Sequence, residues 1–375
     1  MGIIIGADFV PTESNREYFS KGDISYLFGS ELINVLSKSD YRVFNLETPL
    51  TDQKSPIEKM GSAFMAPTST VRAYKDAGVD LLTLANNHIL DQGTAGLRST
   101  IDTLEKAGIN YLGVGNTSEE ASKPYIFECY NKKFGVYACA EHEFSIVTEN
   151  RAGANPFDPF DSCDHIRNLK KECDYVIVLY HGGKEYYRYP SPQLQKRCRK
   201  MVESGANLVI CQHSHCIGCE EDFASGKIIY GQGNFLFDNS DMESWKTGML
   251  IEITDQLYIN YIPVIKKENT VRLADAGEKG KILREFGDRS KEILKDNFVN
   301  VRYSQLADET LMKYLYALQG KESVLFRIVN KLSRNRIREK RLKHLYGKKY
   351  CRAIRNYIEC EAHQELLLQA LKNRS

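Results

Sequence analysis

The chain has 375 residues, of which 42% are hydrophobic and 27% charged, and its formal net charge is +2. This composition is typical of a globular protein of one large or two smaller domains, and it excludes a largely disordered chain. No run of about 18 uncharged apolar residues occurs, so we predict no membrane-spanning helix. Ten scattered cysteines and the absence of an export signal at the start favour reduced thiols in the cytoplasm.

The first 215 residues alternate between short apolar runs and segments of helical period, the pattern of an α/β domain. The apolar runs predict five strands: Ile3–Ala7, Tyr41–Leu46, Val79–Ala85, Tyr175–Tyr180 and Asn207–Cys211. The amphipathic segments predict helices between them: Glu31–Ser37, Val71–Ala77, Thr94–Ala107 and Gln193–Glu203. We expect a sheet whose strands are joined by crossover helices.

Shorter strands and a helical region complete the chain. Tyr125–Tyr130 and Phe134–Cys139 flank a turn and predict a hairpin. Three further strands are predicted at Lys227–Tyr230, Gly248–Ile253 and Leu257–Val264. After residue 276 strand-like runs end, and helical periods follow at roughly 280–296, 305–319, 322–346 and 350–372. We therefore predict an α/β domain over residues 1–275 and a helical region over 276–375.

Each of the five apolar strands is followed by side chains that can bind metal or move protons. These residues are Asp8, Glu47, Asn87, His88, His181, His213 and His215. In open α/β sheets the loops at the carboxyl ends of strands converge on one crevice, so residues distant in sequence can meet there. Taken singly, a strand-end histidine is commonly structural, and a carboxylate can simply cap a helix. The shared placement favours one functional site.

The chemistry of this set predicts one or two divalent metal ions. Carboxylates, an amide oxygen and several imidazoles suit Zn²⁺, Mn²⁺ or Fe²⁺, whereas Ca²⁺ and Mg²⁺ favour oxygen ligands alone. Such ions can activate a water molecule for attack on a phosphoester or an amide-type bond. The residues themselves do not distinguish these two reactions.

Five motifs contain the candidate residues that follow Asp8: Asn45-Leu46-Glu47-Thr48-Pro49-Leu50, Ala85-Asn86-Asn87-His88 with Asp91 and Gly93, His181-Gly182-Gly183-Lys184-Glu185-Tyr186, Gln212-His213-Ser214-His215, and Tyr230-Gly231-Gln232-Gly233-Asn234-Phe235-Leu236-Phe237-Asp238. In this order they resemble the motifs of the CapA-type capsule and poly-γ-glutamate synthesis proteins, within the calcineurin-like metallophosphoesterase superfamily. The resemblance spans residues 3–260. It implies a four-layer αββα sandwich, here with a C-terminal helical appendage.

The resemblance also implies roles for individual residues. It makes Asp8, Glu47 and His215 ligands of one metal ion. It makes Asn87, His181 and His213 ligands of a second ion, with Glu47 shared. His88 matches a general acid oriented by Asp91, and Glu185 and Tyr186 match a motif beside the metal-binding histidine, where they would touch the substrate. Structural loop contacts are an equal alternative for these two residues. For Asn234 a fold-forming role is favoured, and contact with the substrate at the pocket edge is the alternative.

Three positions depart from the family pattern. Val10 stands where the superfamily has a histidine, so the first metal site would lack a ligand. Gly182 replaces a usual tryptophan, which would widen the pocket. Gln212 stands where a small residue commonly occurs, with Cys216 and Cys219 nearby as less favoured thiol ligands.

The C-terminal region is strongly basic. Between Arg327 and Arg355 the chain has twelve Lys or Arg residues and one acid, Glu339. A solvated helix face is the simplest explanation. A functional alternative is contact with an anionic membrane surface, an acidic polymer or capsule-synthesis proteins, while nucleic acid is disfavoured because no binding motif accompanies the charge.

The sequence thus predicts a metal-dependent CapA-like protein that acts on an anionic or polyglutamate-type substrate during capsule synthesis. Two alternatives stay open: a phosphoesterase of small phosphorylated metabolites, and a non-catalytic assembly protein with a degenerate metal site, which Val10 favours. We expect a cytoplasmic location, with peripheral attachment to the inner membrane surface as an option.

Overall fold

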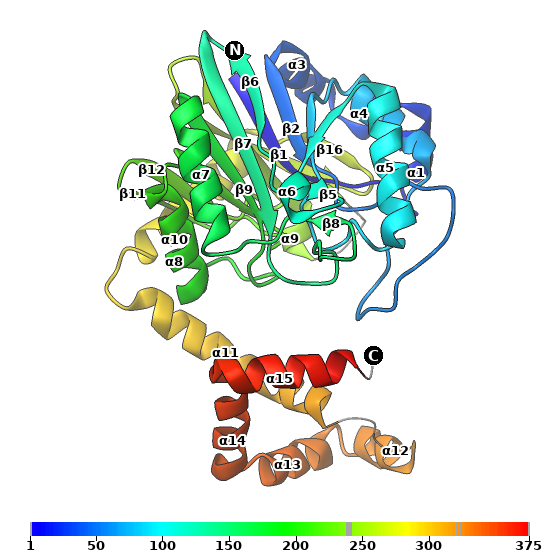
Figure 1. Cartoon of the computed structure of the whole chain (residues 1–375), viewed down its shortest axis with the longest axis vertical. Helices are drawn as coiled ribbons and strands as arrows, with labels where there is room; N and C mark the ends of the chain where they lie inside the picture. Colours follow the sequence, from blue (N-terminus) through cyan, green and yellow to red (C-terminus); the bar gives the residue numbers. More distant parts are fainter. Residues whose placement is uncertain (1, 238–241, 320–321, 323, 374–375) are drawn as a thin grey trace. The chain divides into compact units, whose positions relative to one another are not determined.

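The structure is a computed structural model that describes residues 2–237, 242–319, 322 and 324–373. It divides into two compact units, Met1–Val299 and Asn300–Ser375. The first unit contains both large sheets and is the α/β fold (Figure 1). The second unit is built from helices alone in its described part.

The first sheet combines parallel and antiparallel strands. Its order is β16 (Thr270–Leu273), β15 (Ile259–Lys267), β14 (Thr247–Thr254), β1 (Gly2–Phe9), β2 (Tyr41–Asn45), β3 (Leu81–Thr83) and β4 (Asn110–Leu112), with β13 (Asn234–Leu236) also paired to β1. The strands β1 to β4 run parallel, whereas β14, β15 and β16 pair antiparallel. The parallel half therefore directs its carboxyl ends to one edge.

The second sheet has the same mixed character. Its order is β11 (Glu220–Phe223), β12 (Gly226–Tyr230), β10 (Leu208–Gln212), β9 (Tyr175–His181), β7 (Lys132–Ala140) and β6 (Tyr125–Cys129). The strands β7, β9, β10 and β12 run parallel, and the predicted hairpin of β6 and β7 is confirmed. A two-stranded sheet joins β5 (Val114–Gly115) to β8 (Gly153–Ala154).

Three apolar layers show that the predicted four-layer αββα sandwich is correct. Ile3 and Ile5 of β1 pack in a core shared with second-sheet residues such as Ile177, so the two sheets lie face to face. The opposite face of the first sheet packs against α3 (Ser30–Lys38), α4 (Val71–Asp76) and α5 (Gly93–Ala107). The outer face of the second sheet packs against α7 (Asp161–Glu172) and α8 (Pro192–Glu203), on the other side of the molecule in Figure 1.

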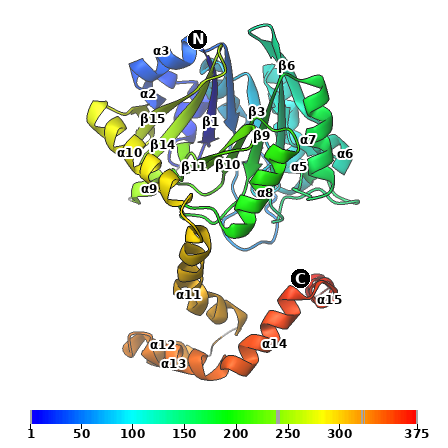
Figure 2. The same cartoon turned by 90° about the vertical axis from the view of Figure 1, so that its left-hand side faces the viewer.

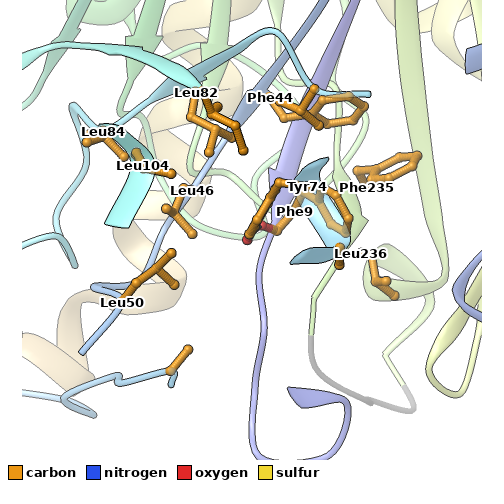
Figure 3. Close-up of a cluster of buried hydrophobic side chains, with 14 of the residues drawn as sticks. Phe9, Phe44, Leu46, Leu50, Tyr74, Leu82, Leu84, Leu104, Phe235 and Leu236 are labelled. Atoms are coloured by element: carbon orange, nitrogen blue, oxygen red, sulfur yellow. Dashed lines mark hydrogen bonds between the residues drawn. The ribbon is translucent and has the colours of Figure 1, made fainter. Parts of the chain in front are cut away.

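An aromatic cluster around Phe9 anchors the outer core of the first sheet. The Phe9 ring is fully buried, and its centroid lies 4.7 Å from that of Tyr74 and 5.3 Å from that of Phe235. Figure 3 shows these three rings together with Phe44. The Tyr74 hydroxyl also donates to the Phe9 carbonyl at 2.6 Å. Because Phe9 directly follows Asp8, this packing fixes the backbone from which the Asp8 carboxylate projects.

All five predicted strands at functional positions occur, with ends shifted by one or two residues. The sequence patterns missed β4, β11 and β16 because these strands have only three or four residues. They also missed α7, where the polar run Asp161–Glu172 obscures an apolar stripe that includes Ile166 and Leu169.

The helical region begins earlier than the division between the units. Ile282 and Phe286 of α10 (Ala276–Glu292) are buried in the core between the sheets. This helix therefore belongs to the first unit, and the predicted boundary at residue 275 differs from the observed division after Val299. A capping box formed by Asp275 and Glu278 starts the helix.

The second unit contains five helices within its described residues: α11 (Phe298–Leu318), α12 (Val324–Leu332), α13 (Arg336–Leu345), α14 (Lys348–Glu359) and α15 (Glu361–Lys372), which Figure 2 traces from gold to red. The predicted helix 322–346 is wrong as one element, because Arg334 and Asn335 adopt left-handed backbone angles and separate α12 from α13. Likewise, Cys360 is extended and splits the predicted helix 350–372. No described helix is long and apolar enough to cross a membrane.

Replacing Phe9 with alanine should destabilise the first unit by about 3–5 kcal/mol, because it leaves a cavity among rings that cannot all close in. The matched control is Phe160→Ala, since that ring is 80% exposed and its loss should change stability by less than about 0.5 kcal/mol. Urea unfolding followed by circular dichroism measures both. Equal losses would contradict the role assigned to the cluster.

Candidate metal centre

The two sheets bring their strand-end side chains to one place. Asp8 lies one residue before the end of β1 and is in register with Asn45 of β2, and Glu47 follows that strand. On the second sheet, His181 ends β9 and is paired with Gln212 of β10. The next residue, His213, has a positive φ of 81°, which turns the chain sharply after the strand. The site therefore forms where both sheets present their carboxyl ends.

Glu47 lies at the centre of this arrangement. Two groups of side chains have potential ligand atoms within 4.8 Å of one another: Glu47 with His213 and His215, and Asp8 with Glu47 and His181. The predicted sets instead placed His215 with Asp8 and His213 with His181. In the structure, His181 Nε2 lies 3.3 Å from Glu47 Oε1 and 3.1 Å from Asn87 Oδ1. The residues thus form one cluster in which Glu47 is common to both groups.

Several atoms in this cluster are buried and lack a hydrogen-bond partner. They are Asp8 Oδ2, both Glu47 carboxylate oxygens and His213 Nδ1. Burying a charged oxygen without compensation costs several kcal/mol, so native proteins rarely leave one unsatisfied. A divalent ion would satisfy all four atoms, because each has a free lone pair when the acids are ionised and the ring is neutral. The residues present therefore fit a metal ion.

A hydrogen bond determines which nitrogen of His215 remains free. His215 Nδ1 lies 2.8 Å from Asn234 Oδ1 and 3.4 Å from Asp8 Oδ2. Because Asn234 Oδ1 is an acceptor, Nδ1 carries a proton, and Nε2 holds the lone pair when the ring is neutral. Metal-binding histidines usually donate their second N–H in this way. The His215 ring also stacks on Trp245, with 5.2 Å between centroids.

Burial and mutual charge shift the pKa values within the cluster. Burial raises the pKa of the Glu47 carboxyl, but the charge of His181 outweighs it and holds that pKa well below its usual range. Burial lowers the pKa of His213 well below its ordinary value, and His181 lowers it further. Burial also disfavours the charged form of His215, yet the ion pair with Asp8 and the charge of Glu47 raise its pKa to about 9. An ionised Glu47 and a neutral His213 are the forms that bind metal.

His88 lies beside the cluster in a separate network. Its Nδ1 lies 2.6 Å from Asp91 Oδ2, and Phe64 stacks on its ring with 4.1 Å between centroids. The Asp91 carboxylate also accepts from the Phe64 backbone N–H and from Lys59 Nζ. Among the four site histidines, the His88 side chain is the most exposed, at 15%. Asp91 thus fixes the ring and leaves Nε2 for proton transfer.

The predicted substrate residues lie in different surroundings. Asn234 is buried and binds His215, so it positions a candidate ligand. Tyr186 is 44% exposed, has a positive φ of 62°, and its ring centroid lies 6.1 Å from that of His215. Glu185 is partly exposed and adjacent to it. Asp238, the last residue of the fifth motif, lies outside the described residues.

The sequence patterns missed four residues at the site. Asn45 donates to Asp8 Oδ1 at 2.7 Å, and Lys59 contacts Asp91 and His88. Glu141 Oε1 lies 3.7 Å from His213 Nε2, and Glu143 accepts from Asn87 at 2.8 Å. The two glutamates follow the carboxyl end of β7, so the signal that identified the other strand-end residues could have found them. Lys59 has no such signal, because it lies in a long loop.

The departures from the family pattern have clear structural consequences. The Val10 side chain is buried and cannot replace the missing histidine as a ligand. A side-chain carbon at Gly182 would meet the Tyr180 ring at 2.7 Å, so a tryptophan there would require Tyr180 to move. Gln212 donates to the Gly6 carbonyl and thereby links the two sheets. Cys216 and Cys219 are buried, and neither belongs to a described group of potential metal ligands.

Comparison with known proteins gives a consistent result. The model of the family described as "Bacterial capsule synthesis protein PGA_cap" matches residues 3–239. The capsule biosynthesis protein CapA of Bacillus anthracis is 31% identical over 236 residues, which cover 60% of this chain and 56% of that protein. The PGA biosynthesis protein CapA of Bacillus subtilis is 30% identical over 212 residues, covering 54% and 55%. The chain therefore spans little more than half the length of these relatives.

Two solved structures share part of the architecture. A hypothetical protein from Thermus thermophilus aligns with a TM-score of 0.41 and 13% identity, covering 72% of this chain and 96% of that one. A protein described as a novel phosphatase from Mycoplasma pneumoniae aligns with a TM-score of 0.44 and 13% identity, covering 72% and 95%. Both scores are below 0.5, so we infer nothing about activity from these likenesses.

Purified protein should contain one to two equivalents of a divalent transition metal. Loss of a residue that supports a metal ligand weakens metal binding by roughly 10–100-fold. Glu47→Gln should weaken it by at least this factor, because Glu47 belongs to both groups. His344→Gln, an exposed position in the second unit, is the control and should bind normally. Plasma emission spectrometry after dialysis measures this. Less than about one equivalent in the unmodified protein, with no effect of Glu47→Gln, would exclude the metal centre.

The metal-free protein should lose stability between about pH 6.5 and 9. The folded-state pKa of His215, about 9, lies above its ordinary value of 6.5. Its protonated ring therefore stabilises the fold fully below pH 6.5, and this contribution disappears as the pH rises through 9. Urea unfolding in EDTA should show a steeper decline for the unmodified protein than for His215→Gln. Parallel declines would show that His215 does not titrate this way.

Proposed function

Because the chain belongs to the bacterial capsule synthesis protein PGA_cap family, we propose that its first unit is a metal-dependent hydrolase or transferase of capsule or poly-γ-glutamate synthesis. The observation that supports this most is the buried Glu47 carboxylate, shared by two groups of metal-binding side chains and lacking any hydrogen-bond partner. A purely structural cluster would have hydrogen bonds to these oxygens.

The ligand chemistry favours Mn²⁺, Fe²⁺ or Zn²⁺ in this centre. Asp8 and His181 with Glu47 would hold one ion, with Asn87 beside His181, and His213 and His215 with Glu47 would hold the other. When bound, such ions supply an activated water and stabilise the oxygens of the substrate. Position 10 adds no ligand to the Asp8 set, because the Val10 side chain offers none.

The protein's own side chains would orient the general acid and supply the proton for the leaving group. Asp91 holds His88 through Nδ1, so His88 Nε2 can give a proton to the leaving group. Lys59 pairs with Asp91 and fixes the position of this carboxylate, and both side chains are almost fully buried. The exposed Tyr186 ring beside His215 would contact the substrate.

The second candidate function is a non-catalytic assembly protein, and Val10 is the observation that favours it. A site with one ligand fewer can retain a structural ion and still lack the second ion needed for turnover. Both proposals predict bound metal, so turnover is the property that distinguishes them.

Replacing His88 with asparagine should lower kcat by about 10²–10⁴-fold, because asparagine cannot transfer a proton. Metal content should stay unchanged, since His88 is assigned no ligand role. The assay pairs an aryl phosphate with a γ-glutamyl anilide in the presence of Mn²⁺. His165→Asn is the control, because His165 binds Tyr137 on another part of the unit.

The outcomes separate the proposals. Turnover of either substrate that depends on His88 supports the enzyme and identifies the bond class. Turnover that persists in His88→Asn would assign the proton transfer to another group. Metal-replete protein that turns over neither substrate would overturn the enzymatic proposal in favour of the assembly protein.

A further inference from the structure

The two units have opposite net charges. Residues 300–375 contain seventeen Lys or Arg residues and seven Asp or Glu residues. The whole chain has 51 basic and 49 acidic residues, so residues 1–299 are net acidic. An imbalance of this size within one small unit creates a positive potential that attracts anionic partners.

Most basic side chains of the second unit are exposed and available. In α14, Lys348, Lys349 and Arg352 are exposed. Between residues 327 and 355, the ion pairs found within the described residues involve only Arg338, Lys343 and Arg355. The positive charge is therefore largely uncompensated within this unit.

The same helices expose large apolar side chains. Leu332 is 82% exposed, Tyr350 64% and Leu366 70%. Further exposed apolar residues are Ile337, Leu345, Tyr357, Ile358, Leu367, Leu368 and Leu371. In α14, Tyr350, Tyr357 and Ile358 recur at helical spacing, on the side of the helix opposite to the basic residues. Apolar exposure on this scale is unusual for a surface that faces only water.

An apolar groove adds a site suited to a hydrocarbon chain. It has a volume of about 250 Å³ and is lined by Leu311 and Leu315 of α11 and by Cys351, Ile354 and Ile358 of α14. The remaining lining residues are Arg355 and Glu359. These two residues form an ion pair with each other at 2.7 Å.

We propose that the second unit binds the surface of a membrane rich in anionic lipids. Basic side chains would contact phosphate headgroups, and the exposed leucine and tyrosine side chains would enter the interface beside them. A soluble acidic polymer or a nucleic acid would use the charges alone and leave the apolar side chains in water. The combination of both features therefore favours lipid over these partners.

Vesicle sedimentation with the full-length protein tests this proposal. The protein should bind vesicles of equal parts phosphatidylglycerol and phosphatidylcholine, and should not bind phosphatidylcholine alone. The triple variant Lys348→Gln, Lys349→Gln, Arg352→Gln should bind on the order of 100-fold more weakly, since each basic residue near such a surface contributes about fivefold. The double variant Ile358→Asn, Leu366→Gln should also bind roughly tenfold more weakly.

The matched control removes three exposed charges from the first unit: Lys38→Gln, Lys106→Gln and Lys123→Gln. It should bind as the unmodified protein does. Circular dichroism monitors folding, and raising the salt concentration tests the electrostatic part without any substitution. Equal binding to neutral vesicles, or equal weakening by the control, would overturn the proposal. So would a higher affinity for soluble poly-γ-glutamate or RNA, or self-association that buries Ile358 and Leu366 without vesicle binding. None of these outcomes depends on enzymatic turnover.

Discussion

The burial of the Glu47 carboxylate is the constraint on which the rest of the site depends. Both its oxygens lie away from water without a hydrogen-bond partner, and an isolated charge in such a position would be strongly destabilising. His181, at 3.3 Å, provides partial compensation. A divalent ion would compensate the rest of the buried negative charge, so that metal binding would stabilise the fold.

This compensation requires both sheets. Glu47 follows a strand of the first sheet, whereas His181 and His213 come from the second. Gln212 and Gln232 reinforce the junction through hydrogen bonds to the Gly6 and Ile5 carbonyls of β1. The apolar core between the sheets therefore has a functional consequence, because a shift of one sheet against the other would separate the ligands.

The histidines of the site differ in burial and in hydrogen-bond partners, and this suits them to different roles. His213 and His215 are nearly fully buried and lie within the ligand groups, whereas His88 is more exposed and is held by Asp91. The second unit differs in character from this centre, since its exposed surface combines uncompensated positive charge with apolar side chains. One chain thus combines an acidic unit that contains the candidate chemistry with a basic unit suited to an anionic surface.

The sequence by itself determined the fold class, the strands at functional positions and the seven strand-end residues. Local periodicity specifies buried strands, and the repeated placement of metal-binding side chains directly after such strands indicates one site. Only the tertiary structure decided how these residues associate. It showed that His213 and His215 lie together around Glu47 and that Asn234 binds His215. It brought Lys59, Glu141 and Glu143 to the site as well. It also divided the two long C-terminal helices at Asn335 and Cys360. These features depend on contacts between segments far apart in the chain and on single backbone angles, and neither leaves a periodic trace in the sequence.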